Sequence, residues 1–219
     1  MSLRIGRGDD AKRALLSNYA VTPVGHNAAP ADGMFVCCCG SAILRGHSFY
    51  TFRALPKAPG LDADVCYASE HCAQRLYALA AAPMAPVVFC DPLGWLEIHK
   101  HKWLLSANDG ADNAVRMSPL NREASEVVTL LMQWVTPRVG SLVEKLAVRL
   151  TAQPANDLDS WDLRALNSAV NRHAASVGGS IQGVVDGLAR RYRQERAPAR
   201  MHFPLIQRAL ANANARSYI

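Results

Sequence analysis

Five of the six cysteines fall in two short clusters whose spacing suits a metal site. The first cluster is Cys37-Cys38-Cys39-Gly40, and the second spans residues 66–72, with a cysteine at each end. Zn²⁺ takes four nitrogen or sulfur ligands in a tetrahedron, whatever the chain distance between the two halves of the site. The sequence therefore predicts one structural zinc ion. The competing interpretation is a set of reduced core cysteines, because free cysteine is among the most buried residue types.

In the first cluster, Cys37 and Cys39 are the predicted ligands, since adjacent cysteines rarely bind one ion together. Cys38 is then expected to point into the core, although it stays an alternative ligand. Gly40 favours a knuckle at this point, because glycine permits the positive φ that turns backbone amides towards a metal-bound sulfur.

The second half of the predicted site lies at the start of a helix. Ser69 is a typical N-cap for a helix over residues 70–77. Cys66 is expected just before this helix and Cys72 in its first turn, where the helix dipole favours a thiolate. These two cysteines complete the predicted ligand set, with His71 as an alternative to Cys72.

Composition and charge limit the class of protein. The 219 residues are 50% hydrophobic, which is enough for a substantial core, and the net charge is +6. The sequence lacks the apolar stretch of a secretory signal and any run as long as a membrane span, so we expect a cytoplasmic protein without membrane contact. In that compartment, clustered cysteines are typical of metal ligands or catalytic thiols and not of disulfides.

The basic excess is concentrated near the C-terminus. Residues 151–219 carry nine basic residues, all arginine, against five acidic ones. Guanidinium groups bind phosphate in a bidentate manner, so this composition favours an anionic partner. A genome of high GC content would give the same preference for arginine over lysine.

The pattern predicts an α+β protein in two parts: a zinc-binding α/β lobe over residues 1–106 and a helical bundle over residues 107–219. A polar loop at 107–113 suggests the boundary. The elements expected in the lobe are a helix at 9–19, loops at 22–25 and 28–33, a strand at 34–36, β-rich chain at 41–55, a buried strand at 87–90 that places Cys90 in the core, and a strand at 95–105. The helices expected in the bundle cover 121–134, 137–151, 160–176, 180–196 and 204–215, with buried leucine stripes.

Basic residues on these elements are candidates for contacting nucleic acid. The strand at 95–105 interleaves lysines with aromatic residues, as a nucleic-acid groove would, although an edge strand kept soluble by its lysines has the same pattern. Arginines at the end of the fourth predicted helix suit a phosphate backbone, but they also complement the helix dipole. The candidates are Arg45, Arg53, Lys57, Lys100 and Lys102 in the lobe, and Arg190, Arg191, Arg193 and Arg196 in the bundle.

A four-ligand zinc finger of treble-clef or ribbon-like type, followed by a β-containing middle and a helical bundle, resembles the large subunit of type IV CRISPR–Cas effector complexes. The matching residues are Cys37, Cys39, Cys66 and Cys72, and the C-x-C first half departs from the usual C-x-x-C. The resemblance implies a non-enzymatic subunit near the 5′ handle of the CRISPR RNA (crRNA). Such a subunit checks the motif that flanks the target and holds the opening DNA strands, while base pairing reads the rest. The implied partners are crRNA, target DNA, the backbone and 5′-handle-binding subunits, and a helicase.

Two other functions compete with this one. A zinc hydrolase would use Glu97, His99 and His101 with a cysteine, leaving an open metal position for water. A closed four-thiolate shell argues against it, and the chain has no Gly-rich phosphate loop, no G-x-S-x-G and no H-E-x-x-H. A stand-alone DNA-binding regulator is the second alternative, and it would bind duplex DNA without RNA or partner subunits.

Overall fold

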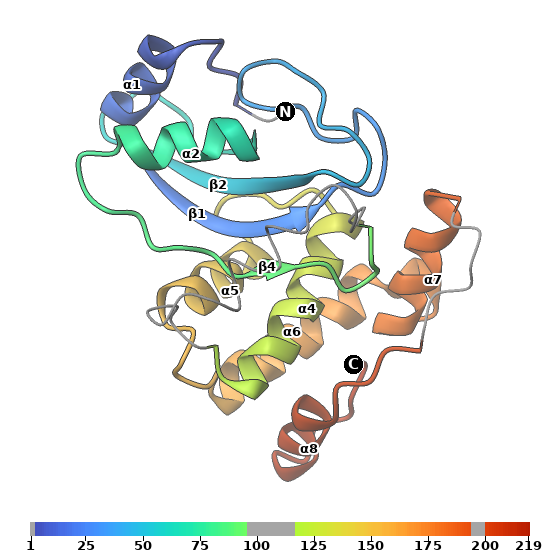
Figure 1. Cartoon of the computed structure of the whole chain (residues 1–219). Helices are drawn as coiled ribbons and strands as arrows, with labels where there is room; N and C mark the ends of the chain where they lie inside the picture. The colour runs from blue at the N-terminus through green and yellow to red at the C-terminus, as the bar shows by residue number, and fades with distance from the viewer. Residues whose placement is uncertain (1–2, 96–116, 194–199) are drawn as a thin grey trace. The chain divides into compact units, whose positions relative to one another are not determined.

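The protein belongs to the α+β class, as the sequence predicts (Figure 1). The structure is a computed structural model, and it describes residues 3–95, 117–193 and 200–219. Within these residues, no helix combines the length and the apolar character needed to cross a bilayer.

The chain divides into two compact units, Met1–Asp112 and Asn113–Ile219, called here the lobe and the helical unit. The predicted boundary between residues 106 and 107 falls in segment 96–116, outside the described residues. The same holds for most of the strand predicted at 95–105, including Lys100 and Lys102.

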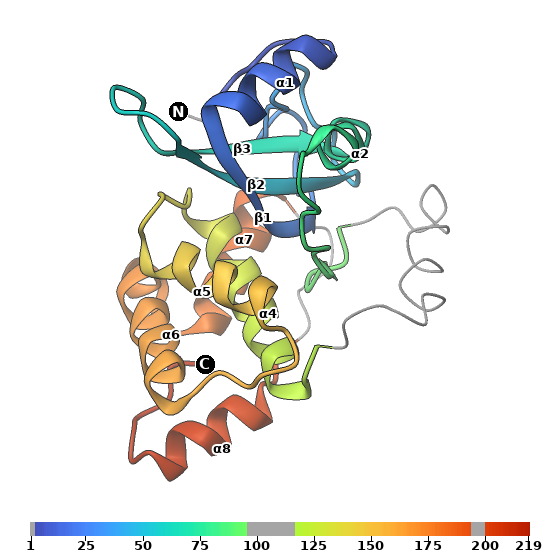
Figure 2. The same ribbon diagram turned by 90° about the vertical axis from the view of Figure 1, so that its left-hand side faces the viewer.

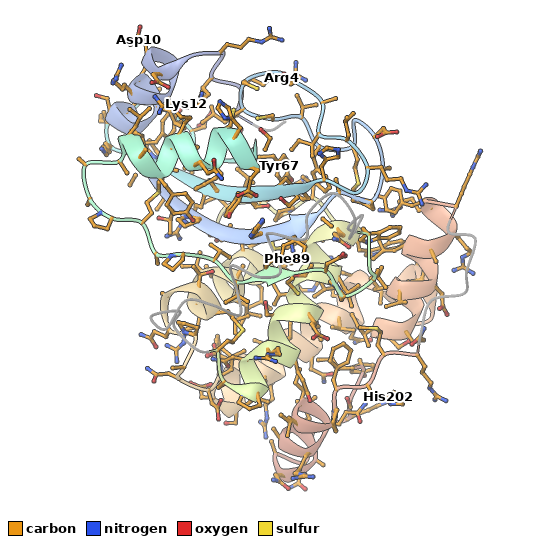
Figure 3. All side chains as sticks on the ribbon, in the orientation of Figure 1. Arg4, Asp10, Lys12, Tyr67, Phe89 and His202 are labelled. Atoms are coloured by element: carbon orange, nitrogen blue, oxygen red, sulfur yellow. The ribbon has the colours of Figure 1, made fainter. Side chains whose placement is uncertain are left out.

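A mixed four-stranded sheet of order β3-β2-β1-β4 forms the centre of the lobe. Its strands are β1 (Tyr19–Ala28), β2 (Ser48–Pro56), β3 (Asp64–Ser69) and β4 (Phe89–Cys90). The pairs β1/β2 and β2/β3 are antiparallel, whereas β4 runs parallel to β1. Tyr67 and Phe89, labelled in Figure 3, come from the two edge strands.

Two helices, α1 (Asp9–Asn18) and α2 (Glu70–Leu79), pack against each other on one face of the sheet (Figures 1 and 2). Phe52 of β2 and Leu76 of α2 are both fully buried, and the ring of Phe52 lies 6.0 Å from that of Tyr77 on α2. The buried apolar side chains of β2 thus fix α2, and with it the start of this helix, over the sheet.

The loop predicted at residues 22–25 is wrong, because these residues belong to β1. The pairing of β1 with β2 shifts register between Pro23 and Gly25. A β-bulge tolerates a residue that cannot donate a ladder hydrogen bond, so the proline interrupts the pairing without ending the strand.

Three other predictions for the lobe need correction. The strand predicted at 34–36 is only an isolated bridge between Val36 and Ala42. In the β-rich stretch 41–55, regular pairing begins at Ser48. The strand predicted at 87–90 is limited to Phe89–Cys90, and Cys90 is half-buried and not in the core.

The helical unit contains the five predicted helices with adjusted ends. They are α4 (Pro119–Trp134), α5 (Leu142–Ala152), α6 (Ser160–His173), α7 (Ile181–Arg191) and α8 (Pro204–Asn212), and a short 3-10 turn, η1 (Ala175–Val177), follows α6. Local capping explains the shifted starts: the Ser141 hydroxyl accepts a hydrogen bond from the Glu144 amide, which fixes the start of α5. Gly178 adopts a left-handed conformation with φ 91° and ends η1.

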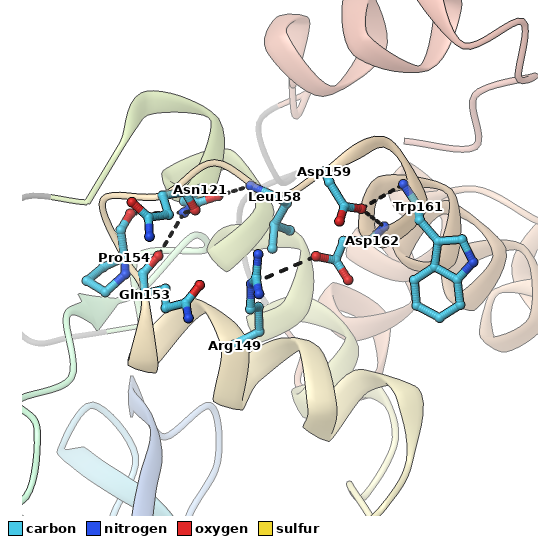
Figure 4. Close-up of polar contacts among 9 residues, drawn as sticks. Asn121, Arg149, Gln153, Pro154, Leu158, Asp159, Trp161 and Asp162 are labelled. Atoms are coloured by element: carbon cyan, nitrogen blue, oxygen red, sulfur yellow. Dashed lines mark hydrogen bonds and ion pairs between the residues drawn. The ribbon is translucent and has the colours of Figure 1, made fainter.

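The predicted leucine stripes form the core of this unit. Leu130, Leu146 and Leu166 are at most 2% exposed. The α5–α6 connection is held on the first turn of α4 by the buried Asn121 (Figure 4). Its side-chain amide donates to the carbonyl of Pro154 at 2.9 Å, and its side-chain oxygen accepts from the amide of Leu158 at 2.9 Å.

Candidate metal centre and nucleic-acid surface

The first cysteine cluster forms the tip of a short hairpin inside the β1–β2 connection. The amide of Ile43 donates to the carbonyl of Phe35 at 2.9 Å, and the amide of Cys37 donates to the carbonyl of Ser41 at 2.8 Å. At the tip, the amide of Gly40 donates to the carbonyl of Cys37 at 2.7 Å, and Gly40 has φ 89°. The positive φ expected of this glycine is confirmed, and the tight turn brings Cys37 and Cys39 close together.

The knuckle lies against the end of β3 and the start of α2. The amide of Cys38 donates to the carbonyl of Tyr67 at 2.6 Å. One step further, the amide of Ser69 donates to the sulfur of Cys37 at 3.3 Å, and the Ser69 hydroxyl oxygen lies 3.6 Å from the same sulfur. Ser69 therefore precedes α2 as predicted, but its side chain makes no capping hydrogen bond to the helix. It faces the knuckle instead.

Three thiols meet at this junction. The sulfur atoms of Cys37, Cys39 and Cys72 all lie within 4.8 Å of one another. Cys37 and Cys72 are buried, whereas Cys39 is half-buried. Tetrahedral zinc with Zn–S bonds of 2.3 Å places its sulfur ligands ~3.8 Å apart. The three thiols can therefore hold one metal ion after a movement of about 1 Å, and soft sulfur donors of this kind suit zinc.

The fourth predicted ligand, Cys66, is not part of this group. It lies just before α2 as predicted, but within strand β3, and it is fully buried opposite Phe52 in the β2–β3 pairing. Opposite residues of an antiparallel pair share a face, so Cys66 points into the core beneath α2 with Phe52. His71 is exposed and also stands outside the group.

The environment of the knuckle favours a thiolate at Cys37. Hydrogen bonds from the Cys38 thiol and from the amides of Cys39 and Ser69 lower the pKa of Cys37, against the opposing effect of burial. The bond to Cys37, together with burial, raises the pKa of Cys38. Burial raises the pKa of Cys66 to about 12. Because the thiolate is the metal-binding form, Cys37 is prepared for coordination, whereas Cys38 and Cys66 favour the neutral thiol.

A second polar group lies beside the metal centre, at the first residue of α2. One carboxylate oxygen of Glu70 accepts a hydrogen bond from the Ser48 hydroxyl at 2.9 Å and lies 3.5 Å from Nε2 of His26. The His26 ring stacks on Tyr50 at 3.9 Å. Burial raises the pKa of Glu70, but the close contact with His26 and the hydrogen bond from Ser48 outweigh it, so that pKa is lowered.

The basic candidates of the lobe differ in their surroundings. Arg45 is exposed in the β1–β2 connection, and Arg53 is half-buried on β2. Lys57 is exposed, but its ammonium donates to the carbonyl of Leu16 at 2.6 Å and so ties the end of β2 to α1.

In the helical unit, Arg190 and Arg193 are exposed, and Arg196 lies outside the described residues. Arg191 is exposed as well, yet its guanidinium lies 4.0 Å above the Trp134 ring and donates to the Trp134 carbonyl at 3.0 Å. Helix α7 ends at Arg191, so the cluster lies in the last turn and just after it.

On the helical unit, exposed basic side chains greatly outnumber exposed acidic ones, and the basic residues extend beyond those predicted from the sequence. Within residues 117–193 and 200–219, two acidic side chains are exposed, Asp157 and Asp159. Eleven basic side chains are exposed over the same residues: Arg122, Arg138, Lys145, Arg164, Arg172, Arg190, Arg191, Arg193, Arg200, Arg208 and Arg216. The excess of arginine is visible in the sequence, but the burial or partial burial of most acidic side chains of this unit is not.

Comparison with known proteins places the chain in a family. No curated protein and no solved structure matches it. A family model described as "Uncharacterised conserved protein UCP028583" matches residues 4–218, which takes in both the lobe and the helical unit. The chain belongs to the UCP028583 family.

Proposed function

We propose that the protein is a nucleic-acid-binding subunit whose helical unit contacts the phosphate backbone and whose lobe is stabilised by one zinc ion. The observation that carries the proposal is the eleven exposed basic side chains of the helical unit against two exposed acidic ones. Contacts of Lys and Arg with phosphates supply most of the sequence-independent affinity for nucleic acids. All but one of these basic residues are arginine, the side chain that matches phosphate best.

The acidic residues of this unit serve the fold. The carboxylate of Glu123 accepts hydrogen bonds from the amides of Leu205 and Ile206, both at 3.0 Å, at the start of α8. Glu144 is 1% exposed and accepts from the amide of Gly140 at 3.1 Å. Because Glu144 is buried and Glu123 is half-buried, the exposed side chains of this unit carry a larger positive excess than the net charge of +6 suggests.

The zinc ion has a structural role in this proposal. The knuckle and α2 are joined at the three-thiol cluster, which links Cys72 to Cys39 and Cys37, 33 and 35 positions earlier in the chain. Binding of structural zinc to finger peptides releases on the order of 10–16 kcal/mol, so one ion can decide whether such a junction forms. Thiol ligands also require a reducing compartment, which supports a cytoplasmic location.

The more specific form of the proposal is a non-catalytic large subunit of a type IV CRISPR effector complex. It rests on the resemblance carried by the cysteine pattern and on the order of a zinc-binding lobe before a helical unit. The partners would then be crRNA, target DNA and other effector subunits. The helical unit would hold nucleic-acid backbone, whereas Arg45 and other lobe residues would contact the target-flanking motif.

Binding of the purified protein to labelled single-stranded RNA and duplex DNA, at several salt concentrations, tests the nucleic-acid proposal. We expect binding that weakens with salt, and a combined Arg190→Ala and Arg193→Ala variant should flatten the log–log slope by roughly 0.9 per lost duplex phosphate contact. The matched control is Arg13→Ala, which removes an exposed arginine from the lobe where Arg13 pairs with Asp10 at 2.9 Å. No binding at low salt, or equal slopes for all three proteins, would contradict the proposal.

Co-purification separates the effector subunit from a stand-alone regulator. A subunit should bring RNA and partner proteins from its native cell, whereas a regulator should come alone and bind duplex DNA. The zinc hydrolase depends on Glu97, His99 and His101, which lie outside the described residues. Nuclease, deaminase and nucleotide-hydrolysis assays with divalent metals test it directly, and we expect no turnover.

A further inference from the structure

Within the described residues three thiols form the cluster, so no described side chain is assigned to the fourth vertex of a zinc tetrahedron, and Ser69 lies beside the cluster. Ser69 precedes Cys72 by three positions, which is the spacing at which two ligands of one zinc site commonly occur. Its hydroxyl oxygen is 3.6 Å from the sulfur of Cys37. A serine thus lies next to the cluster, at a chain position from which a cysteine could supply a fourth thiolate.

The other cysteines near the knuckle are less suited to that vertex. Cys66 is fully buried in the middle of β3, opposite Phe52. The sulfur of Cys38 lies 3.9 Å from that of Cys37, but the backbone of Cys38 is fixed by the hydrogen bond from its amide to the carbonyl of Tyr67. Neither sulfur belongs to the group in which all the ligand atoms lie within 4.8 Å of one another.

The cluster is less buried on the side of Cys39 and Ser69. Cys39 and Ser69 are both half-buried, whereas Cys37 and Cys72 are buried. The side of the cluster formed by Cys39 and Ser69 is therefore the side that solvent reaches. A zinc ion with three protein ligands and a solvent-accessible fourth position exchanges the ligand at that position.

We propose that the metal is held by the thiolates of Cys37, Cys39 and Cys72, and that its fourth position, beside Ser69, takes an exchangeable ligand. In the isolated protein that ligand is solvent, and a soft donor such as a thiol or an imidazole replaces it. The inference rests on the zinc part of the proposed function and is independent of nucleic-acid binding. It replaces the closed four-thiolate shell expected from the sequence, so the expectation of no catalysis then depends on the missing motifs and on the assays above.

Cobalt substitution of the full-length protein tests the ligand set, because the intensity of the sulfur-to-cobalt absorption grows with the number of thiolates. We expect a three-thiolate spectrum whose visible bands shift when imidazole is added. The Ser69→Cys variant should gain about a third in charge-transfer intensity, as three thiolates become four, and should lose its response to imidazole. It should also bind zinc about tenfold more tightly or better, since a thiolate replaces an oxygen donor.

Two further variants keep the test decisive even where Ser69→Cys fails to fold. Ser69→Ala should retain the three-thiolate spectrum and its response to imidazole, because the hydroxyl is not itself a ligand. Cys66→Ser should retain the wild-type spectrum. A wild-type spectrum of four thiolates that ignores imidazole and falls to three in Cys66→Ser or Cys38→Ser would overturn the inference. A wild-type protein that binds no metal at all would overturn the zinc part of the proposed function as well, leaving nucleic-acid binding to its own test.

Discussion

The guanidinium of Arg191 lies 4.0 Å above the ring of Trp134 and donates a hydrogen bond to its backbone carbonyl at 3.0 Å. This contact joins the last turn of α7 to the last turn of α4. The indole N–H of Trp134 donates to the carbonyl of His173 at the end of α6, at 2.9 Å. One tryptophan therefore connects three helices, and Arg191, predicted as a phosphate contact, has a structural role.

Removal of Arg191 should therefore cost stability, unlike removal of its neighbour. We expect Arg191→Ala to lower the free energy of unfolding by about 1–2 kcal/mol, because a charge-assisted hydrogen bond and a partly exposed cation–π contact are lost. Arg190→Ala, at an exposed site, should stay within about 0.5 kcal/mol of wild type. Urea unfolding followed by helical circular dichroism measures both. Equal losses in the two variants would show that the contact with Trp134 contributes nothing.

Two glycines of α7 mark close packing in the helical unit. A Cβ at Gly183 would lie 1.8 Å from the carbonyl oxygen of Val177, and one at Gly187 would lie 2.8 Å from the Trp134 ring. Alanine favours helix by about 1 kcal/mol over glycine. We nevertheless expect Gly183→Ala to destabilise by about 2–3 kcal/mol, since a backbone atom must move. Gly187→Ala should cost less, because a side chain can shift.

Ser168→Ala on the exposed face of α6 is the matched control for these two variants. It adds no atom and should change the melting temperature little. Should Gly183→Ala melt at or above the wild-type temperature, the close approach of α7 to η1 would not exist in solution.

Metal removal should affect the lobe selectively. We expect about one zinc per chain in the wild type and almost none in Cys37→Ser, whereas Cys90→Ser, outside the three-thiol cluster, should keep its metal. Chelation should broaden or shift the amide resonances of the knuckle, the end of β3 and the start of α2, because the ion joins these segments. Resonances of α4 to α8 should change little. A chelated protein with unchanged lobe resonances would exclude a structural role for the metal.

Acid should weaken the lobe through Glu70, whose pKa the contact with His26 and the hydrogen bond from Ser48 hold below the ordinary value of 4.5. A carboxyl with a lowered pKa stabilises the folded state above its ordinary pKa, and this contribution disappears as the pH falls through the lowered value. We expect Glu70→Gln to be less stable than wild type near neutral pH, with the difference closing as the pH falls below the ordinary value of 4.5 and through the lowered pKa.

Glu126→Gln provides a control of opposite sign. Burial raises the pKa of Glu126, and the charge of Glu123 adds to the effect. Ionised Glu126 therefore opposes folding at neutral pH, so its removal should stabilise the protein there and lose its effect in acid. Thermal unfolding of both variants between about pH 3 and 7 measures the two trends. A constant offset between Glu70→Gln and wild type across this range would mean that the carboxylate is not the source of the difference.

The sequence alone was sufficient to predict structural features that depend on residues close together in the chain. The turn at Gly40 and the start of α2 after Ser69 follow from a positive-φ residue and an N-cap type. The five helices of the helical unit follow from apolar residues at helical spacing, and their predicted ends differ by a few residues where caps such as Ser141 decide them. The proximity of Cys37 to Cys39 is likewise set by a local turn, which spans residues 37–41.

Only the tertiary structure decided the features that depend on contacts between residues distant in the chain. Pro23 stands inside β1 because β2 pairs across a bulge, and no signal near residue 23 encodes that partner. Cys66 lies outside the three-thiol cluster because the β2–β3 register places it opposite Phe52, whereas Ser69 is brought to Cys37 from 32 residues away. The composition determined how many charges the chain carries, but packing decided which are exposed, since burial and hydrogen bonding of a carboxylate such as Glu144 depend on the folded neighbours.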